Sequence, residues 1–298
     1  MTKAKLKHQL FLKVKGRNVL ITGASSGIGL TVAKQLADSG AHVILVARSV
    51  DKLEEVKAEI EANGGRASVF PCDLNDMQAI DDTADKILAS VDRIDILINN
   101  AGRSIRRAVH ESTERFHDFE RTMQLNYFGS VRLILKFLPT MMIHHSGHII
   151  NISSIGVLAN ATRFSAYVAS KAALDAFGRC LSAEAHAHRV AITSVYMPLV
   201  RTPMIAPTKI YNYVPALTPE QAADLVAEAI VKRPKKVATA LGRLASITYA
   251  IAPDINNKLM SIGYNLFPSS RASVGEDKEI KLNWVQRAYA KIFPGEHW

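Results

Sequence analysis

The sequence predicts an α/β fold, in which a doubly wound parallel sheet of about seven strands carries helices on both faces and is followed by a helical C-terminal extension. Three observations support this prediction. Short apolar runs alternate with longer stretches of helical periodicity from Val19 to about residue 240. The apolar runs are continuous, as expected for parallel strands that are buried on both faces. After residue 240 only helical stretches remain, with prolines between them.

The predicted strands are seven short apolar runs, at 19–22, 42–46, 67–70, 94–98, 147–152, 190–195 and 237–240. The predicted helices lie between and after them, at 28–39, 51–63, 76–90, 114–143, 165–187 and 219–231. Further helical stretches follow at 244–252, 255–266 and 282–292. We therefore expect a leader at residues 1–15, one domain at residues 16–240 and a C-terminal extension at residues 241–298 that packs on the core.

Composition narrows the class of protein. The chain has 298 residues, of which 48% are hydrophobic, enough for a sizeable core. No apolar run reaches the 18 residues that a membrane-spanning helix needs. The two cysteines, Cys72 and Cys180, form neither a disulfide framework nor a zinc site, and we expect no metal. Such cysteine usage indicates a reducing, cytoplasmic location.

The formal net charge of +10 indicates an anionic partner, which would be nucleic acid, a membrane surface or a phosphorylated small molecule. The basic residues gather in three clusters: Lys3, Lys5, Lys7, Lys13, Lys15 and Arg17; Lys232, Arg233, Lys235 and Lys236; and Arg103, Arg106 and Arg107. Nucleic acid is disfavoured, because the chain has neither zinc-finger spacing nor an RNA-binding aromatic signature.

The leader has two open interpretations. Leu6, Leu10, Phe11 and Val14 fall at helical spacing between lysines, which is typical of a short amphipathic helix in peripheral contact with a membrane. The alternative is a solvated tail. A secretory signal peptide does not fit, because lysine interrupts the apolar stretch.

A glycine-rich segment follows the first predicted strand and opens the first predicted helix. Its residues are Thr22-Gly23-Ala24-Ser25-Ser26-Gly27-Ile28-Gly29. Glycines let the backbone turn tightly and approach a pyrophosphate, to which the helix N-terminus offers free N–H groups. Strand, glycine loop and helix together predict a Rossmann-like dinucleotide site.

Residues after the next strands refine the cofactor prediction. The second strand is followed by Arg48 and Ser49 without an acidic residue, which favours NADP(H) over NAD(H), because arginine can pair with the 2′-phosphate. Asp73, beside Leu74, either accepts a hydrogen bond from adenine or caps a helix that starts at Asn75. The fourth strand ends in a small-residue segment that would let the backbone pass close to a ribose: Asn100, Ala101 and Gly102.

Four further residues complete a recognisable pattern. Tyr167 and Lys171 are four residues apart at the start of a helix and share one face, and Ser154 precedes Tyr167 by thirteen residues. Asn126 lies in the long preceding helix. With the glycine loop and the Asn-Asn-Ala-Gly segment at 99–102, this set resembles the short-chain dehydrogenase/reductase family.

The resemblance implies a role for each residue in reducing a carbonyl group. Tyr167 would donate the proton, while Lys171 would lower the pKa of Tyr167, ordinarily near 10, and hold the ribose. Ser154 would bind the carbonyl oxygen, with Ser153 as its rival, and Asn126 would anchor a water linked to Lys171. Three residues after the sixth strand would bind the nicotinamide carboxamide: Pro198, Val200 and Thr202.

Other segments resemble the bacterial fatty acyl-coenzyme A reductases of wax-ester synthesis. They lie at 100–107, 164–177, 197–208 and 241–250 and in the terminal Pro-Gly-Glu-His-Trp, and so extend over nearly the whole chain. This resemblance implies reduction of a long-chain acyl-coenzyme A to the fatty aldehyde by NADPH, with release of coenzyme A. The implied substrate residues are Arg103, Arg106 and Arg107 for the phosphates, and Met204 and Ile205 in an apolar lid.

Some alternatives stay open at this point. The same fold could reduce a 3-ketoacyl, steroid, aldehyde or ketone substrate, because fold does not determine function. Neither Cys72 nor Cys180 is placed as a nucleophile, so we expect direct hydride addition to the thioester. Family members are commonly dimers or tetramers, so we expect a homo-oligomer.

Overall fold

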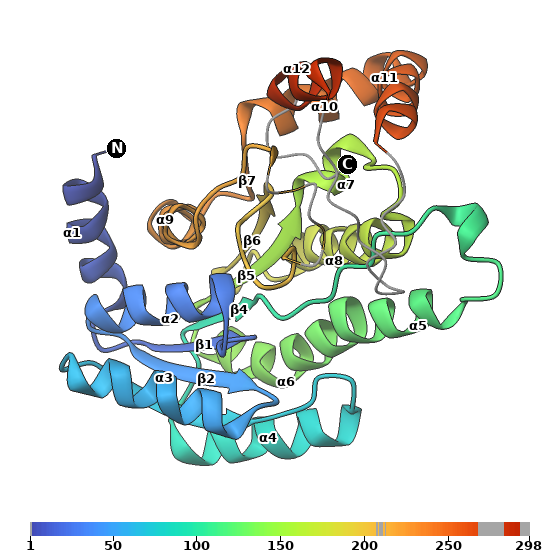
Figure 1. Cartoon of the computed structure of the whole chain (residues 1–298). Helices are drawn as coiled ribbons and strands as arrows, with labels where there is room; N and C mark the ends of the chain where they lie inside the picture. The colour runs from blue at the N-terminus through green and yellow to red at the C-terminus, as the bar shows by residue number, and fades with distance from the viewer. Residues whose placement is uncertain (1, 207, 209–210, 212, 268–282, 293–298) are drawn as a thin grey trace.

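The computed structural model describes residues 2–206, 208, 211, 213–267 and 283–292. Within them, seven strands form one parallel sheet in the order β3-β2-β1-β4-β5-β6-β7 (Figure 1). The strands are β1 (Asn18–Thr22), β2 (His42–Ala47), β3 (Arg66–Pro71), β4 (Ile96–Asn99), β5 (Gly147–Ser154), β6 (Val190–Met197) and β7 (Lys236–Ala238). The predicted seven-stranded parallel sheet is confirmed.

Helices cover both faces of the sheet, where they connect the strands, precede β1 or follow β7. They are α1 (Lys3–Val14), α2 (Gly27–Asp38), α3 (Val50–Ala62), α4 (Met77–Ser90), α5 (His117–Met123), α6 (Ser130–Ile143), α7 (Ile155–Ala159), α8 (Ser165–Glu184), α9 (Pro219–Lys232), α10 (Ala240–Ile251), α11 (Pro253–Leu266) and α12 (Trp284–Ile292). The single helix expected at 114–143 is α5, a π-helical segment (Gln124–Gly129) and α6 in succession.

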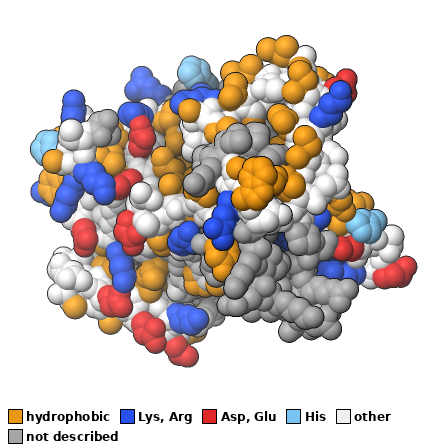
Figure 2. Space-filling view, turned by 45° about the horizontal axis from the view of Figure 1, so that its top comes forward, with side chains coloured by type: hydrophobic (Ala, Val, Ile, Leu, Met, Phe, Trp, Pro, Cys, Tyr) orange, Lys and Arg blue, Asp and Glu red, His pale blue; other side chains and the backbone are white. Residues whose placement is uncertain are grey.

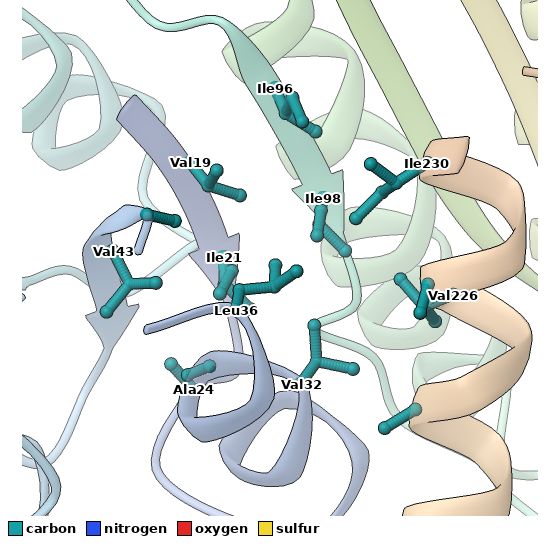
Figure 3. Close-up of a cluster of buried hydrophobic side chains, with 14 of the residues drawn as sticks. Val19, Ile21, Ala24, Val32, Leu36, Val43, Ile96, Ile98, Val226 and Ile230 are labelled. Carbon is teal, nitrogen blue, oxygen red and sulfur yellow. The ribbon is translucent and has the colours of Figure 1, made fainter. Parts of the chain in front are cut away.

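Alternating residues of each strand pack into two hydrophobic cores, one on each face of the sheet. Val19 and Ile21 of β1 join a cluster with α2, α3 and α9, which Figure 3 shows in part. Leu20, which lies between them, joins the opposite cluster with α4, α6 and α8. Each strand therefore buries apolar side chains on both sides, which explains why the strands are continuous apolar runs in the sequence.

The sheet reverses its winding direction between β1 and β4. From β1 the chain proceeds outward to β2 and β3, then returns across β1 to β4 and continues outward through β5, β6 and β7. In such sheets the helices leave the central strands on opposite sides, so a crevice opens at their carboxyl ends. The residues that follow β1 and β4 therefore meet at the place where this fold binds ligands.

The leader is neither a solvated tail nor a helix with its apolar stripe free for lipid. It forms α1, capped by the Thr2 hydroxyl, and its Leu10 and Val14 side chains are 1% and 0% exposed in the core cluster beside α9. Both interpretations of the sequence missed this packing, because an apolar stripe between lysines does not reveal whether protein or lipid covers it. Phe11, which was part of the predicted stripe, remains 37% exposed.

The C-terminal helices lie together at one end of the molecule (Figure 1). α10 packs on α7 and α11, and Met260 of α11 and Phe267 join a third apolar cluster that contains Tyr167. The division of the chain at residues 15 and 240 stays a prediction. The terminal motif at 294–298 and the proline at 268 lie outside the described residues. None of the described helices has the length and hydropathy to cross a membrane.

Candidate active site

Two cavities lie at the carboxyl ends of the central strands. One, of about 180 Å³, is lined by Tyr167 and Lys171, and the other, of about 540 Å³, is lined by Arg48 and Asp73. Both linings include Gly23, Ser26, Ala101 and Gly102. We therefore describe them as a catalytic-side and an adenine-side cavity that meet at the glycine loop, where β1 and β4 end.

The glycine loop has a geometry that other residues would disturb. Gly23 and Gly27 adopt φ of +66° and +54°, in the left-handed region that favours glycine. A Cβ atom on Gly29 would lie 2.3 Å from the carbonyl oxygen of Gly23, which is impossible without moving backbone. The loop therefore requires glycine at all three positions, at Gly23 and Gly27 because of the left-handed φ and at Gly29 because a Cβ atom would clash with the backbone.

The N-terminus of α2 opens toward both cavities. Ser26 precedes the helix and makes no side-chain capping bond, so its hydroxyl does not satisfy the first free N–H groups of α2. Gly27 and Ile28 line the catalytic-side cavity, while Ser25 lines the adenine side. Uncapped N–H groups and the positive end of the helix dipole are suited to a pyrophosphate.

Thr22 is a positioning residue that the sequence did not reveal. Its hydroxyl oxygen accepts hydrogen bonds from the backbone N–H groups of Asn100 and Ala101, at 3.0 and 2.9 Å. The Asn100 side chain donates in return to the carbonyl oxygen of Thr22 at 2.9 Å. These bonds join the ends of β1 and β4 and hold the small-residue segment against the glycine loop.

The adenine-side cavity brings together the residues predicted there: Arg48, Ser49, Asp73 and Leu74, with Lys52 in addition. The prediction that Asp73 caps a helix starting at Asn75 is wrong. α4 begins at Met77, and Asp76 is the residue that accepts from the N–H groups of its first turn. Asp73 Oδ1 instead accepts from the backbone and side-chain nitrogens of Asn75, at 3.0 and 2.7 Å.

Tyr167 and Ser154 are both buried beside the catalytic-side cavity. Burial raises the pKa of Tyr167 above its ordinary value, and a hydrogen bond with the Ser154 side chain opposes this increase. The Ser154 hydroxyl oxygen also accepts from the N–H of Gly156 at 3.1 Å, which caps α7. In this cofactor-free state Tyr167 therefore keeps its proton at neutral pH, as a proton donor must.

Lys171 lies one helical turn beyond Tyr167 and lines the same cavity. Its side chain is buried, and burial lowers its pKa to about 8. We expected from the sequence that Lys171 would lower the pKa of Tyr167. In the cofactor-free structure the pKa of Tyr167 is raised on balance, and only the hydrogen bond with Ser154 opposes the increase. The role of Lys171 stays a prediction.

Ser153 lies next to Ser154 but differs from it in its contacts. Successive strand residues point to opposite faces, and Ser153 lines the catalytic-side cavity. Its buried hydroxyl has no hydrogen-bond partner among the described residues. The choice between the two serines stays a prediction, although the contact with Tyr167 belongs to Ser154.

Asn126 occupies the π-helical segment between α5 and α6. Such segments are rare and often mark functional sites. The Asn126 side chain accepts from the N–H of Arg103 at 2.8 Å and donates to the Arg103 carbonyl and the Ser170 hydroxyl, both at 2.9 Å. Both amide hydrogens are thus in use, and the expected link to Lys171 through a water stays a prediction.

The segment after β6 lies across the catalytic-side cavity. The predicted residues Pro198, Val200, Thr202, Met204 and Ile205 all line it. Val200 forms a bridge with Leu217 at the far end of this lid. Arg201, which sequence reasoning did not select, donates to the Tyr211 and Val214 carbonyls at 3.3 Å and so holds the lid. The lid predicted from the sequence comprises residues 204–217, of which 207, 209–210 and 212 lie outside the described residues.

The three arginines after the Asn-Asn-Ala-Gly segment have different surroundings. Arg106 hydrogen-bonds to the Tyr211 side chain under the lid, and Arg107 Nε donates to Asp118 at 3.2 Å. Burial lowers the pKa of Arg103, as do Arg121 and Arg48, which places Arg103 within electrostatic range of both. Arg103 and Arg107 are thus both near Asp118, whereas Arg106 contacts Tyr211.

Comparisons with known proteins fit this geometry. A family model described as short chain dehydrogenase matches residues 17–210. A protein of Acinetobacter baylyi named fatty acyl-CoA reductase is 74% identical over 285 residues, which cover 96% of each chain. A protein of Mycobacterium tuberculosis also named fatty acyl-CoA reductase is 47% identical over 246 residues, which cover 82% of this chain and 84% of that one.

Solved structures with the same fold include cofactor complexes. A metagenomic short-chain oxidoreductase in complex with NADP is 32% identical with a TM-score of 0.66, covering 76% of this chain and 98% of that one. The L-sorbose reductase of Gluconobacter frateurii, complexed with NADPH and L-sorbose, is 26% identical with a TM-score of 0.69, covering 75% and 93%.

Proposed function

The chain belongs to the short-chain dehydrogenase family of oxidoreductases, and we propose that it reduces long-chain fatty acyl-coenzyme A to the fatty aldehyde with NADPH and releases coenzyme A. The observation that carries this proposal is the 74% identity, over 96% of both chains, to a relative named fatty acyl-CoA reductase. An alignment of that extent reaches beyond the residues matched by the family model into the C-terminal helices, so the likeness is not one of shared fold alone.

The residues present fit NADP(H). Gly29 leaves a cradle that a single Cβ would fill, and the free N-terminus of α2 would bind the pyrophosphate. Arg48 and Lys52 line the adenine-side cavity, where their positive charges favour a 2′-phosphate. Asp73 would accept from adenine, and Asn100, Ala101 and Gly102 would lie along the ribose. The cofactor supplies the hydride.

Tyr167 and Ser154 would act on the thioester oxygen. As the carbonyl carbon gains hydride, its oxygen gains negative charge, which hydrogen bonds from both hydroxyls stabilise. Tyr167 donates the proton, and its hydrogen bond with Ser154 keeps the two groups on the same oxygen. The C–S bond then breaks, the aldehyde carbonyl re-forms as that proton leaves, and coenzyme A departs as the thiolate or, once protonated, the thiol.

Lys171 and Asn126 would support this chemistry without contacting the thioester oxygen. The ammonium group of Lys171 would hold the nicotinamide ribose and favour the tyrosinate once Tyr167 has released its proton. Asn126 fixes the Arg103 backbone and Ser170 by three hydrogen bonds, and thereby the helix that carries Tyr167 and Lys171. Pro198, Val200 and Thr202 would bind the carboxamide.

The acyl chain would extend under the lid. Met204 and Ile205 line the catalytic-side cavity, and Ile205 packs on the apolar cluster that includes Tyr167, Tyr211 and Met260. A cavity that is polar at Tyr167 and apolar beyond it suits a thioester with a long hydrocarbon chain.

The test is turnover by the purified protein with palmitoyl-coenzyme A and NADPH. NADPH oxidation, free thiol and aldehyde are measured together, for the wild type, Tyr167→Phe and the control Tyr249→Phe. Tyr249 is 44% exposed on α10 and lines neither cavity, so this change should leave turnover unchanged. Loss of general acid catalysis should lower the rate by about 10²–10⁴-fold in Tyr167→Phe.

The outcomes separate two reactions. Equal amounts of oxidised cofactor, thiol and aldehyde, lost only in Tyr167→Phe, support the proposal. If ketones or aldehydes are reduced and no thiol appears, the protein reduces a different carbonyl, as the fold neighbour named L-sorbose reductase does by its name.

We propose two further associations, a homo-oligomer and peripheral contact with a lipid surface. α10 and α11 expose Leu244, Ile247, Ile251 and Ile255, each at least 55% accessible, and Figure 2 shows hydrophobic side chains gathered at this end of the molecule. The lipid proposal therefore rests on these helices instead of α1. Vesicle co-sedimentation of wild type and Ile247→Asp/Ile251→Asp tests it, and light scattering gives the oligomeric state.

A further inference from the structure

One buried carboxylate gathers three arginines at the start of α5. Arg115 Nε and Arg107 Nε each donate to Asp118 Oδ2 at 3.2 Å, and Arg121 pairs with Oδ1. The Asp118 side chain is 2% exposed, whereas those of Arg115 and Arg121 are 39% and 44% exposed. Asp118 therefore holds two guanidinium groups in place at the surface.

The cluster carries more positive than negative charge. Burial alone would raise the pKa of Asp118, but Arg115, Arg121 and Arg107 hold it below its ordinary value, so Asp118 stays ionised. One carboxylate neutralises one of the three guanidinium groups. Arg103 lies within electrostatic range of Arg121 and adds a further charge. A single arginine would be enough to neutralise the charge of Asp118. Charge neutralisation therefore does not explain why three arginines contact it.

The two exposed arginines have donors to spare. A guanidinium group has five N–H donors, and Arg115 contacts Asp118 through Nε only, with no other partner among the described residues. Its planar shape suits a phosphate, to which two of its N–H groups can donate at once.

The position of the cluster links it to the active site. Arg103 follows Gly102 of the cofactor cavities and is bound through its backbone to Asn126. Helical spacing places Arg121 on the same side of α5 as Asp118. Phe119 and Met123 line a separate apolar groove. Arg103 therefore connects the cluster with the adenine-side cavity, because it is within electrostatic range of both Arg121 and the cavity residue Arg48. The apolar groove is distinct from the cluster.

We propose that Arg115 and Arg121, with Arg103 beside them, bind the nucleotide phosphates of coenzyme A, and above all its 3′-phosphate. This inference rests on the proposed function and names the residues that recognise the carrier half of the substrate. It keeps Arg103 of the expected set and leaves out the other two: Arg106 hydrogen-bonds to Tyr211, and the Arg107 side chain is only 19% exposed.

The test compares coenzyme A with dephospho-coenzyme A, which lacks only the 3′-phosphate, by calorimetry on the full chain. The wild type should bind coenzyme A more tightly, and Arg115→Gln/Arg121→Gln should weaken coenzyme A binding about 10- to 100-fold, to the level of the dephospho compound. Arg179→Gln is the matched control, because Arg179 is a 74% exposed arginine that also pairs with an aspartate, Asp175. NADPH affinity should stay the same in all variants.

Two binding results and one kinetic result would overturn the proposal. The binding results are a wild type that binds both compounds equally, or a double variant that loses NADPH affinity in parallel, which would assign the arginines to the cofactor. Circular dichroism checks that the variants are folded. Because binding needs no turnover, the 3′-phosphate preference can hold even if the protein reduces no thioester. Conversely, palmitoyl-coenzyme A reduction with an unchanged KM in the double variant would leave the function intact and refute the site.

Discussion

The ammonium group of Lys171 donates a 2.8 Å hydrogen bond to the carbonyl oxygen of Ile152, inside the cavity that Tyr167 also lines. Ile152 belongs to β5, so this bond joins the catalytic helix α8 to the centre of the sheet. Burial lowers the pKa of Lys171 to about 8. The charge of this lysine therefore changes close to neutral pH in the cofactor-free protein.

The first prediction is that stability rises with pH because of Lys171. Between pH 8 and 10.5 the unfolded chain keeps a proton that the folded protein has lost from Lys171. Stability increases with pH wherever the unfolded state binds more protons. The increase in the free energy of unfolding that Lys171 contributes over this whole pH range is on the order of 3 kcal/mol. Urea unfolding at several pH values should show this increase in the wild type and not in Lys171→Met.

Other groups titrate in the same range, so the comparison needs a control. Lys86→Met removes an exposed lysine of α4 and should give the same pH dependence as the wild type. If the curves of wild type and Lys171→Met run parallel from pH 7.5 to 10.5, Lys171 does not have the lowered pKa, and this reasoning fails.

The second prediction concerns Thr22, whose hydroxyl accepts from Asn100 and Ala101. Thr22→Val keeps the shape and leaves these two N–H groups without their acceptor, at a cost of about 1–3 kcal/mol. The segment that would lie along the ribose then loosens, and NADPH should bind about 5- to 100-fold more weakly by fluorescence titration. Thr22→Ser retains the oxygen and should bind as the wild type does. Equal affinity of Thr22→Val would contradict the positioning role.

The third prediction is that Arg48 decides between the two nicotinamide cofactors. Arg48 lines the adenine-side cavity near Asp73 and Lys52. Arg48→Ala removes hydrogen bonds of a charged donor, which lowers kcat/KM for NADPH about 10- to 100-fold. The value for NADH should hardly change, because NADH has no 2′-phosphate to lose. A parallel fall for both cofactors would mean that Arg48 acts on the fold and not on the phosphate.

Much of the fold and the site followed from local sequence signals. Continuous apolar runs predict buried parallel strands, and the residues after them necessarily meet at one edge of the sheet. That argument predicts that Gly23 and Asn100 lie together, and the resemblance to the dehydrogenase family adds Ser154 and Tyr167. All four lie around the two cavities or beside them.

What the sequence could not predict depends on contacts between distant segments. Thr22 is the last residue of a strand whose sequence is unremarkable. Its hydroxyl becomes a hydrogen-bond acceptor only because Asn100, far along the chain, lies beside it in the fold. In the sequence Asp118 is one of the acidic residues in the first turn of a helix. Only the structure shows that its side chain is buried and surrounded by arginines. The stripe of α1 was equally ambiguous, because α9, which covers it, comes some two hundred residues later.

The fourth prediction is that neither cysteine takes part in catalysis. Burial raises the pKa of Cys72, which disfavours the reactive thiolate. Cys72 is a residue of the adenine-side cavity, and its thiol donates to the Ala79 carbonyl oxygen at 3.6 Å. Cys180 is exposed on α8 and lines neither cavity. Direct hydride addition to the thioester therefore needs no acyl-enzyme.

The Cys72→Ala/Cys180→Ala variant should reduce palmitoyl-coenzyme A at nearly the wild-type rate, with stability lowered by about 1 kcal/mol for the buried site. Incubating the wild type with palmitoyl-coenzyme A but without NADPH should leave its intact mass unchanged. A covalent acyl adduct that disappears in the variant, together with loss of turnover in a folded protein, would establish a thiol nucleophile instead. Because the adduct and the rate are measured separately, a variant that is merely less stable cannot produce both results.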